Sequence, residues 1–206
     1  MVLQSQNLLI KHLVNKLRDS QTNFGEFRNI LSQIAKLLCA EALEHSSTFT
    51  KTVMTWNGPF AAEFIDEKKI VFIPILRAGE PMLDGVLELL PNSVGGFLAM
   101  KRDEKTAKSK IYYKRFPNLK DKIVILLDPM VATGGSLIDA ISLIKKESPK
   151  AIITLNVIGS PFGVNAVLQT HNDIKMYIAQ IDDKLDENKY ICPGLGDAGD
   201  RAFNTL

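Results

Sequence analysis

The sequence predicts an α/β fold built on an open, mostly parallel, twisted sheet with helices on both faces. From residue 69 onward, short apolar runs recur that are nearly continuous rather than alternating, as in strands buried on both faces of a parallel sheet. Segments with helical periodicity separate these runs. Strand, helix and strand in this order favour right-handed crossovers within one sheet.

Residues 1–48 are expected to form two helices ahead of the sheet. Leucines recur at four-residue spacing and predict an amphipathic helix over about residues 8–18. Asn23 and Glu26 have the spacing of a capping box and predict the start of a second helix. Its apolar side includes Phe27, Ile30, Leu31, Ile34, Leu37 and Leu38. Packing explains both helices, and their position also makes them candidates for a subunit contact.

Five apolar runs are expected to form the strands, at residues 70–76, 94–100, 123–127, 151–158 and 174–181. Between the third and fourth runs, residues 136–147 place Leu137, Ile141 and Ile144 on one face of a helix. Before a helix over residues 162–170, Ser160 suits the cap and Pro161 the first helical position.

The composition excludes several classes of protein. The 206 residues are 46% hydrophobic and 23% charged, which is typical of a globular protein that can bury a large core. A formal net charge of +2 is far below that of a general nucleic-acid binder. The two cysteines, Cys39 and Cys192, are too few for a disulfide framework. No run approaches the roughly 18 apolar residues of a membrane span and no secretory signal is recognisable, so we expect a cytoplasmic protein without a membrane partner.

We expect a single domain over residues 1–206 with its α/β core over 69–182, because no repeat, low-complexity tract or long linker divides the chain. Two segments depart from the pattern. Residues 101–115 carry seven Lys or Arg against two acids, and residues 188–206 are rich in Gly and Asp with little periodicity. Long irregular segments in a compact domain tend to be functional or disordered.

Residues 128–136 (DPMVATGGS) form the most informative segment. They follow the third apolar run directly and lead into a helix, where backbone N–H groups and the helix dipole attract an anion. Gly134 and Gly135 let the backbone approach closely and adopt φ > 0, and the carboxylate of Asp128 can accept hydrogen bonds from sugar hydroxyls. Since the segment lacks the Lys of a Walker A motif and the spacing of the dinucleotide fingerprint, it predicts a phosphate site of another kind.

This segment resembles the loop of type I phosphoribosyltransferases that binds 5-phosphoribosyl-1-pyrophosphate (PRPP), in the form found in uracil phosphoribosyltransferases. Residues 74–79 (PILRAG) with 81–87 (PMLDGVL) resemble the family's second PRPP segment, and residues 190–203 (YICPGLGDAGDRAF) resemble its uracil-binding tail. The match has near-constant spacing from about residue 56 to the C-terminus. It implies the type I phosphoribosyltransferase fold and a pyrimidine salvage reaction in which PRPP and uracil give UMP and pyrophosphate.

The resemblance also implies roles for residues. The 131–136 turn would hold the 5′-phosphate and Asp128 the ribose, while Arg77 and Arg102, at two strand ends, would stabilise the charge of the pyrophosphate. The full PRPP set is Arg77, Arg102, Asp128, Pro129, Met130, Val131, Ala132, Thr133, Gly134, Gly135, Ser136 and Asp197. Backbone groups at Ile191, Gly196, Asp197 and Ala198 would recognise uracil. No residue is assigned as a general acid or base.

Further expectations concern a lid, a metal and partners. The basic lid arm, residues 101–115, would cover the site with Tyr112 and Tyr113, or would be only a solvated hairpin. Mg²⁺ would arrive bound to PRPP, with Asp197 as the candidate protein contact, and no zinc site is expected because the three histidines share no motif spacing with acids or cysteines. The resemblance further implies a homodimer or higher homo-oligomer, and GTP as a candidate activator without a located site.

Four positions depart from the family pattern. Glu80 stands where an apolar residue is usual, and pairing with Arg77 would weaken the pyrophosphate site. Lys101, Lys105 and Phe162 also differ, and bear on kinetics and regulation more than on reaction type.

Two alternatives stay open. One is a regulator of pyrimidine genes that binds PRPP and UMP and acts on RNA, although the low net charge and the uracil-type tail count against it. The other is a phosphoribosyltransferase for another nucleobase.

Overall fold

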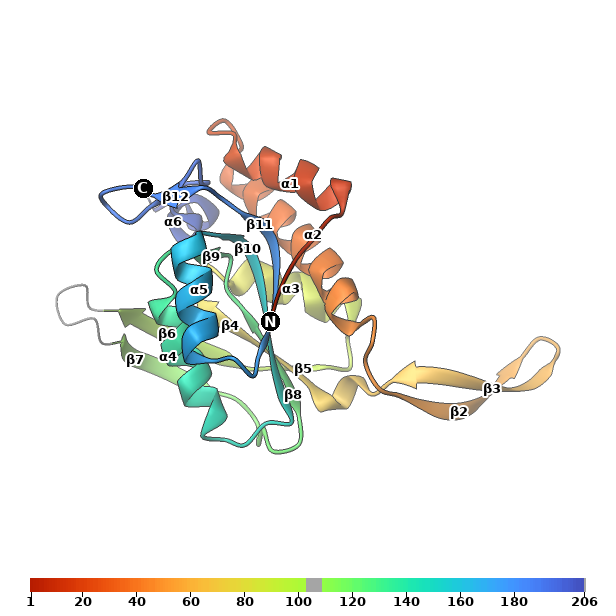
Figure 1. The fold of residues 1–206 in the computed structure, drawn as a ribbon. Helices are drawn as coiled ribbons and strands as arrows, with labels where there is room; N and C mark the ends of the chain where they lie inside the picture. The colour runs from red at the N-terminus through yellow and green to blue at the C-terminus, as the bar shows by residue number, and fades with distance from the viewer. Residues whose placement is uncertain (103–108, 206) are drawn as a thin grey trace.

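The computed structural model describes residues 1–102 and 109–205, apart from the side chains of Lys101 and Arg102. Its main sheet contains β1 (Val2–Gln4), β4 (Ile70–Leu76), β5 (Val94–Gly95), β6 (Phe97–Arg102), β7 (Ser109–Arg115), β8 (Ile123–Leu127), β9 (Met130–Val131), β10 (Ala151–Gly159) and β11 (Lys175–Ile181). The order is β1-β11-β10-β8-β4-β6-β7, with β5 beside β4 and β9 beside β10 (Figure 1). Only β6 and β7 pair antiparallel within it, so the predicted open, mostly parallel sheet is confirmed.

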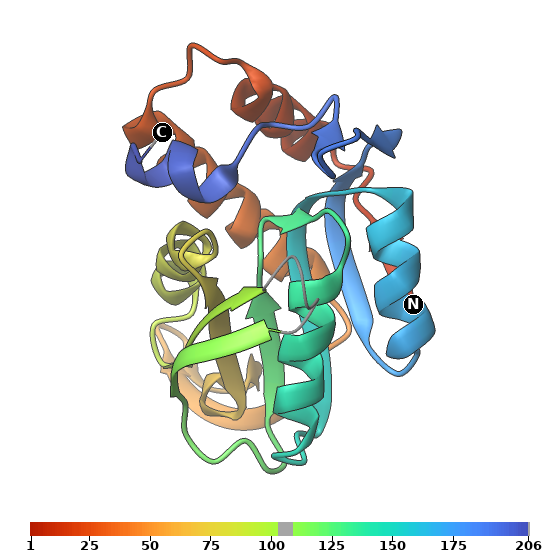
Figure 2. The ribbon, with the colours of Figure 1, turned by 90° about the vertical axis from the view of Figure 1, so that its left-hand side faces the viewer.

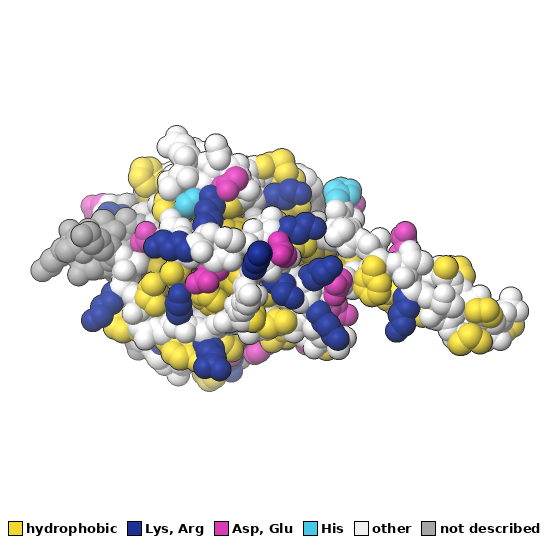
Figure 3. Space-filling model, turned by 90° about the horizontal axis from the view of Figure 1, so that it is seen from below, with side chains coloured by type: hydrophobic (Ala, Val, Ile, Leu, Met, Phe, Trp, Pro, Cys, Tyr) yellow, Lys and Arg dark blue, Asp and Glu magenta, His cyan; other side chains and the backbone are white. Residues whose placement is uncertain are grey.

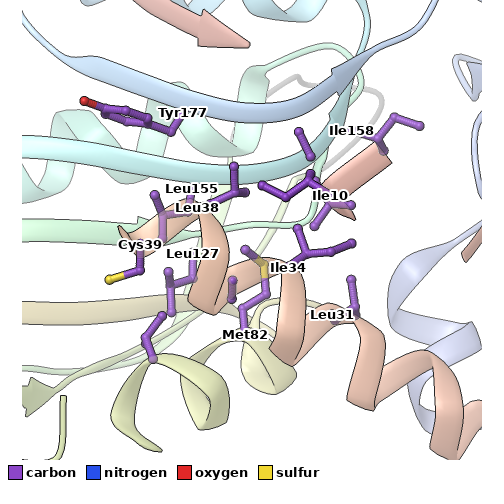
Figure 4. Packing of buried hydrophobic residues seen from close by; sticks show 14 of the residues in the cluster. Ile10, Leu31, Ile34, Leu38, Cys39, Met82, Leu127, Leu155, Ile158 and Tyr177 are labelled. Atoms are coloured by element: carbon purple, nitrogen blue, oxygen red, sulfur yellow. The ribbon is translucent and has the colours of Figure 1, made fainter. Parts of the chain in front are cut away.

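Helices cover both faces of this sheet (Figure 2). One face carries α1 (Leu8–Arg18), α2 (Phe24–Leu43), α3 (Glu80–Leu89) and the short α6 (Ala198–Phe203), and the other carries α4 (Gly135–Lys145) and α5 (Pro161–Thr170). Strand β8 serves both cores, because Leu127 faces the first group of helices and Leu126 the second. Figure 4 shows the first core, where Leu38 and Met82 lie near Leu127.

The helix predictions are confirmed closely. The side chain of Asn23 caps α2 by accepting from the N–H of Glu26 at 3.0 Å, and Ser160 caps α5 by accepting from Gly163 at 2.9 Å. The expected strand 94–100 is split at Gly96 into β5 and β6. The N–H of Gly96 still donates to the carbonyl oxygen of Phe72 in β4 at 2.7 Å.

A hairpin, β2 (Thr48–Thr55) and β3 (Gly58–Ile65), was not predicted and extends from the body (Figure 1). It is followed by a short 3-10 helix, η1 (Glu67–Lys69), that leads into β4. The signal was present in the sequence, because Asn57-Gly58 between apolar residues is typical of a hairpin turn. Hydrophobic side chains are visible along its surface in Figure 3.

Two smaller observations complete the fold. Among the described residues, no helix combines the length and the apolar character needed to cross a bilayer. Both cysteines are free thiols, and burial raises the pKa of Cys39 to about 12, so this thiol is inert and packs as part of the core.

Candidate active site

The carboxyl ends of β4, β8, β10 and β11 meet at one edge of the sheet, because these strands are parallel neighbours. Arg77, Asp128, Ser160 and Asp182 each follow one of these strands directly. The C-terminal segment returns to this edge beside the N-terminal helices (Figure 2). The structure therefore brings together Arg77, the 128–136 loop and the tail, as the sequence predicted.

The loop 128–136 does not pass straight from strand to helix. After Asp128 it forms β9, whose residues pair in parallel with Ile158 and Gly159 of β10. Only then does it reach α4 through Ala132, Thr133 and Gly134. The sequence predicted that the loop leads from the strand directly into the helix. The structure differs, because the loop first pairs with β10 and is anchored by that strand.

The start of α4 offers free donors at this edge. In the described structure, the N–H groups of Thr133, Gly134, Gly135 and Ser136 donate to no protein acceptor, and Gly134 caps the helix without a side-chain bond. These groups lie at the positive end of the helix dipole. The arrangement suits an anion, as predicted, but only Gly134 has positive φ, at 78°. The expectation of positive φ at Gly135 is wrong, because that residue already belongs to the helix.

Contacts with α5 hold this loop in place. A Cβ on Gly134 would lie 2.7 Å from the carbonyl oxygen of Gly163, and a Cβ on Gly163 would collide with the carbonyl oxygen of Ala132. The Ser160 hydroxyl donates to that same Ala132 oxygen at 2.6 Å. The loop and α5 thus pack backbone to backbone, a contact that the sequence did not reveal because the two glycines are distant in the chain.

Asp128 is a buried carboxyl group, with 9% of the residue exposed. Burial raises its pKa to about 7, and a hydrogen bond from the Met130 N–H, at 3.3 Å, opposes this only weakly. Its own carbonyl oxygen accepts from the side chain of Asn156 at 2.7 Å. The backbone of Asp128 is therefore fixed while its carboxyl group keeps unused capacity to accept hydrogen bonds.

Arg77 is exposed and pairs with the tail. Its Nη2 lies 2.9 Å from Oδ1 of Asp200, and hydrogen bonds from Thr205 and Arg77 lower the pKa of that carboxyl group. The possible pairing with Glu80 is not what the structure shows, because among the described residues Arg77 forms its ion pair with Asp200. Burial raises the pKa of Glu80, nearby Asp84 adds to the rise, and Arg28 opposes it.

Other predicted positions are only partly visible. Arg102 ends β6 opposite Ser109, but its side chain lies outside the described part, as does Lys105 of the lid arm. Within that arm, residues 109–115 form β7, and Tyr112 and Tyr113 are exposed. Phe162 is exposed on the first turn of α5.

The tail is more ordered than its composition suggested. Ile191 begins β13 (Ile191–Cys192), which pairs with β12 (Lys184–Leu185), and Ala198 opens the unpredicted helix α6. The side chain of Asp197 caps this helix by accepting from the Asp200 N–H at 2.9 Å. Gly196 is exposed with φ 77°, and neither its N–H and C=O nor the N–H of Ala198 has a protein partner in the described structure.

Basic residues that the sequence analysis missed hold the tail against α1. Arg201 donates to the carbonyl oxygens of Leu195 at 2.8 Å, of Asp19 at 2.6 Å, and of Leu17. Arg18 bonds to the tail as well. No local signal identifies these residues, because their partners are separated from them by the fold rather than by a motif spacing.

Comparisons with known proteins agree with this arrangement. A family model described as uracil phosphoribosyltransferase matches residues 4–205. A uracil phosphoribosyltransferase from Thermosipho melanesiensis is 45% identical over 198 residues, covering 96% of this chain and 95% of the relative. A solved structure of a protein from Aquifex aeolicus has a TM-score of 0.95 at 40% identity, with 98% of both chains covered.

A more distant likeness concerns the fold alone. A hypoxanthine-guanine phosphoribosyltransferase from Bacillus anthracis matches with a TM-score of 0.52 at 16% identity, over 77% of this chain and 80% of that one. The predicted phosphoribosyltransferase fold is confirmed by this likeness and by the family match. The chain belongs to the uracil phosphoribosyltransferase family.

Proposed function

We propose that this protein transfers the phosphoribosyl group of PRPP to uracil and so forms UMP and pyrophosphate. The observation that carries the proposal is the meeting of two sets of free backbone groups at one sheet edge. One set, at the start of α4, suits a phosphate, and the other, at Gly196 and Ala198, suits a small planar ligand with both donors and acceptors. The names of the close relatives support uracil and PRPP as the substrates.

Within this proposal, PRPP binds along residues 128–136. The N–H groups at 133–136 hold the 5′-phosphate, and the carboxyl group of Asp128 accepts from the ribose hydroxyls. Arg77 and Arg102 stabilise the pyrophosphate, because guanidinium groups suit a polyanion. Arg77 then exchanges its ion pair with Asp200 for the ligand's phosphates, a step that its exposure permits.

Uracil binds against the tail. Ile191, Gly196, Asp197 and Ala198 present backbone groups to its two carbonyl and two N–H groups. Cytosine carries an amino group where uracil has a carbonyl, so a backbone donor fixed at that point would be left unpaired, at a cost of about 1–3 kcal/mol. Exposure of Gly196 and Asp197 keeps this surface accessible to a ligand.

Magnesium fits this site as a companion of PRPP. Among the described residues no group of three or more His, Cys, Asp or Glu gathers around one point, and Mg²⁺ is commonly held by one or two carboxylates together with substrate phosphates. The Asp197 carboxylate, which uses one oxygen to cap α6, is the protein group that would contribute. When bound, the ion would offset the negative charge that collects on the leaving pyrophosphate.

The protein's own part in the reaction is placement and charge stabilisation. As the bond from the ribose to pyrophosphate breaks and uracil N1 bonds to the same carbon, positive character develops on the sugar and negative charge on the leaving group. The arginines stabilise the latter, while the two backbone surfaces align the reactants. In this proposal Tyr112 and Tyr113, exposed on β7 in the described part of the lid arm, cover the reactants and limit hydrolysis of PRPP by water.

A turnover assay tests the proposal. Protein is mixed with PRPP, Mg²⁺ and labelled uracil, with and without GTP as a candidate activator, and UMP and pyrophosphate are measured. We expect many turnovers and a clear preference for uracil over cytosine, hypoxanthine and adenine. Stoichiometric binding without turnover would favour the RNA-acting regulator instead, and a preferred purine would show that the tail recognises another base.

We also propose that the chain acts in the cytoplasm as a homodimer or larger homo-oligomer, with the β2–β3 hairpin as the contact. Cross-strand pairing puts one set of apolar side chains on the same face, namely Phe49, Val53, Phe60, Ala62 and Phe64. Phe60 is 59% exposed, and Trp56 at the turn is 97% exposed. Because an isolated two-stranded hairpin is only marginally stable in water, a second copy is the partner that would cover this face by symmetry.

A further inference from the structure

Arg18 and Asp182 form an enclosed ion pair between the end of α1 and the end of β11. The guanidinium binds both carboxylate oxygens, with Nη1 2.7 Å from Oδ2 and Nη2 2.6 Å from Oδ1. Only 2% of the Asp182 side chain and 20% of the Arg18 side chain are exposed. Two-point pairing of this kind fixes orientation as well as distance.

The pair also binds both polar groups of one residue in the tail. Nη1 of Arg18 donates to the carbonyl oxygen of Gly194 at 2.8 Å, and the N–H of Gly194 donates to Oδ2 of Asp182 at 2.8 Å. Gly194 has φ 64°, and a Cβ there would collide with the carbonyl oxygen of Ile191. The conformation and the orientation of Gly194 are therefore both fixed. Gly194 lies two residues before Gly196, which carries free backbone groups of the proposed uracil site.

We infer that Arg18 and Asp182 are positioning residues for the nucleobase. They touch neither substrate in the proposed site, but they orient the base segment, residues 191–198, whose free backbone groups lie at Gly196 and Ala198. Asp182 is in turn anchored to the sheet, because its N–H donates to the carbonyl of Gly159 at 2.8 Å. The inference rests on the proposed function and adds to it a contribution of α1, through Arg18, to base recognition.

A purely structural role makes a different prediction from a positioning role. If the pair only stabilised the fold, its loss would lower the melting temperature and leave the kinetic constants of the folded enzyme unchanged. If the pair positions the base segment, the KM for uracil rises more than the KM for PRPP. Most of the proposed PRPP contacts lie on the phosphate loop 128–136, which α5 holds separately, and only Asp197 of the PRPP set lies in the base segment.

The test uses Asp182→Asn, Arg18→Gln and the double variant, assayed at a temperature where circular dichroism shows each to be folded. The double variant leaves no unpaired buried charge and so keeps the test valid if a single variant unfolds. We expect the KM for uracil to rise about 10- to 100-fold, the scale of a small displacement in a binding surface, with a smaller rise for Arg18→Lys. Lys36→Gln, which breaks an exposed pair with Glu88, is the matched control and should change nothing.

Hydrogen exchange of the amides in residues 191–198 gives a readout that does not depend on turnover. In the variants, exchange should accelerate there and stay unchanged at residues 133–136. Equal rises in both KM values, or an unchanged KM for uracil with a lower melting temperature, would overturn the inference. A wild-type enzyme without turnover would instead refute the proposed function, and the exchange data would still decide the role of the pair.

Discussion

Asp128 links stability to ligand binding through one buried carboxyl group. Its pKa is about 7 in the folded protein against an ordinary 3.8. Between about pH 4 and pH 7 the folded state therefore binds more protons than the unfolded state, so stability falls as pH rises through this window and is level above it. Under the proposed function, this cost accompanies an acceptor for the ribose hydroxyls at this position.

Asp128→Asn should remove that pH dependence. The amide has no charge to bury, so the melting temperature of the variant should be flat between pH 5 and pH 8 and exceed that of the wild type at pH 8. Its affinity for PRPP, measured by calorimetry, should fall. The exposed Asp121→Asn is the control and should keep the wild-type slope. An unchanged slope in Asp128→Asn would show that another group titrates.

Arg77 is an exposed arginine that forms an ion pair with Asp200 and is proposed to bind the pyrophosphate. Replacing it with alanine removes a donor to the pyrophosphate, and kcat/KM for PRPP should fall by about 10²–10³. The fold should persist, because the side chain is 57% exposed and its ion pair with Asp200 lies at the surface. Lys69→Ala, on η1 and also exposed, serves as the control in the same steady-state assay. A wild-type rate in Arg77→Ala would remove the residue from the site.

The orientation of the free N–H groups at the start of α4 depends on backbone geometry more than on side chains. Its free N–H groups can point to one ligand only because Gly134 turns the chain with positive φ and lets α5 approach. The proposed phosphate site therefore depends on the packing of α4 against α5 and not on the loop sequence alone.

Gly134→Ala should weaken PRPP binding at least tenfold. The added Cβ meets the backbone oxygen of Gly163, and the residue must also keep a φ that alanine disfavours. Gly95→Ala is the matched control, since its Cβ would have ordinary contacts with the nearest atom 3.6 Å away. Calorimetry with PRPP measures both. Equal affinity in the two variants would mean that the loop binds no phosphate.

Across the molecule, the hairpin β2–β3 is the part least explained by the monomer. Its apolar face stays largely exposed in the described chain, with Phe60 at 59%, Phe49 at 47% and Phe64 at 41%. The rings of Phe49 and Phe64 lie 6.1 Å apart on it. Such a surface costs solubility unless a partner covers it. This argues for assembly through the hairpin rather than through the N-terminal helices, whose buried sides already face the core.

Phe60→Asp should dissociate the proposed oligomer. The substitution removes a large exposed ring from the apolar face and adds a carboxylate whose desolvation opposes association, although Lys51 lies on the same face. Light scattering should therefore report a smaller mass than for the wild type. Thr52→Asp lies on the opposite face of the same hairpin and should keep the wild-type mass. If both variants and the wild type are monomeric at micromolar concentration, the proposed contact is absent.

The sequence by itself determined the core strands and the helices α1, α2, α4 and α5, because apolar periodicity and caps such as Asn23 and Ser160 are local signals. It did not reveal the β2–β3 hairpin or α6. It also indicated the phosphate loop and the tail, since their glycines and acids are contiguous in the chain. It placed Arg77 and Asp128 correctly at strand ends, and parallel strands bring such ends to one edge.

Only the tertiary structure decided which groups are partnered. Arg77 bonds to Asp200 rather than to Glu80, and Arg18 reaches Asp182 and Gly194, all across long stretches of sequence. The raised pKa of Asp128 is also a tertiary effect, because the residues that bury its carboxyl group are brought around it by the fold. Local patterns are set by nearest neighbours along the chain, whereas ion pairs and desolvation depend on distances that exist only once the chain has folded.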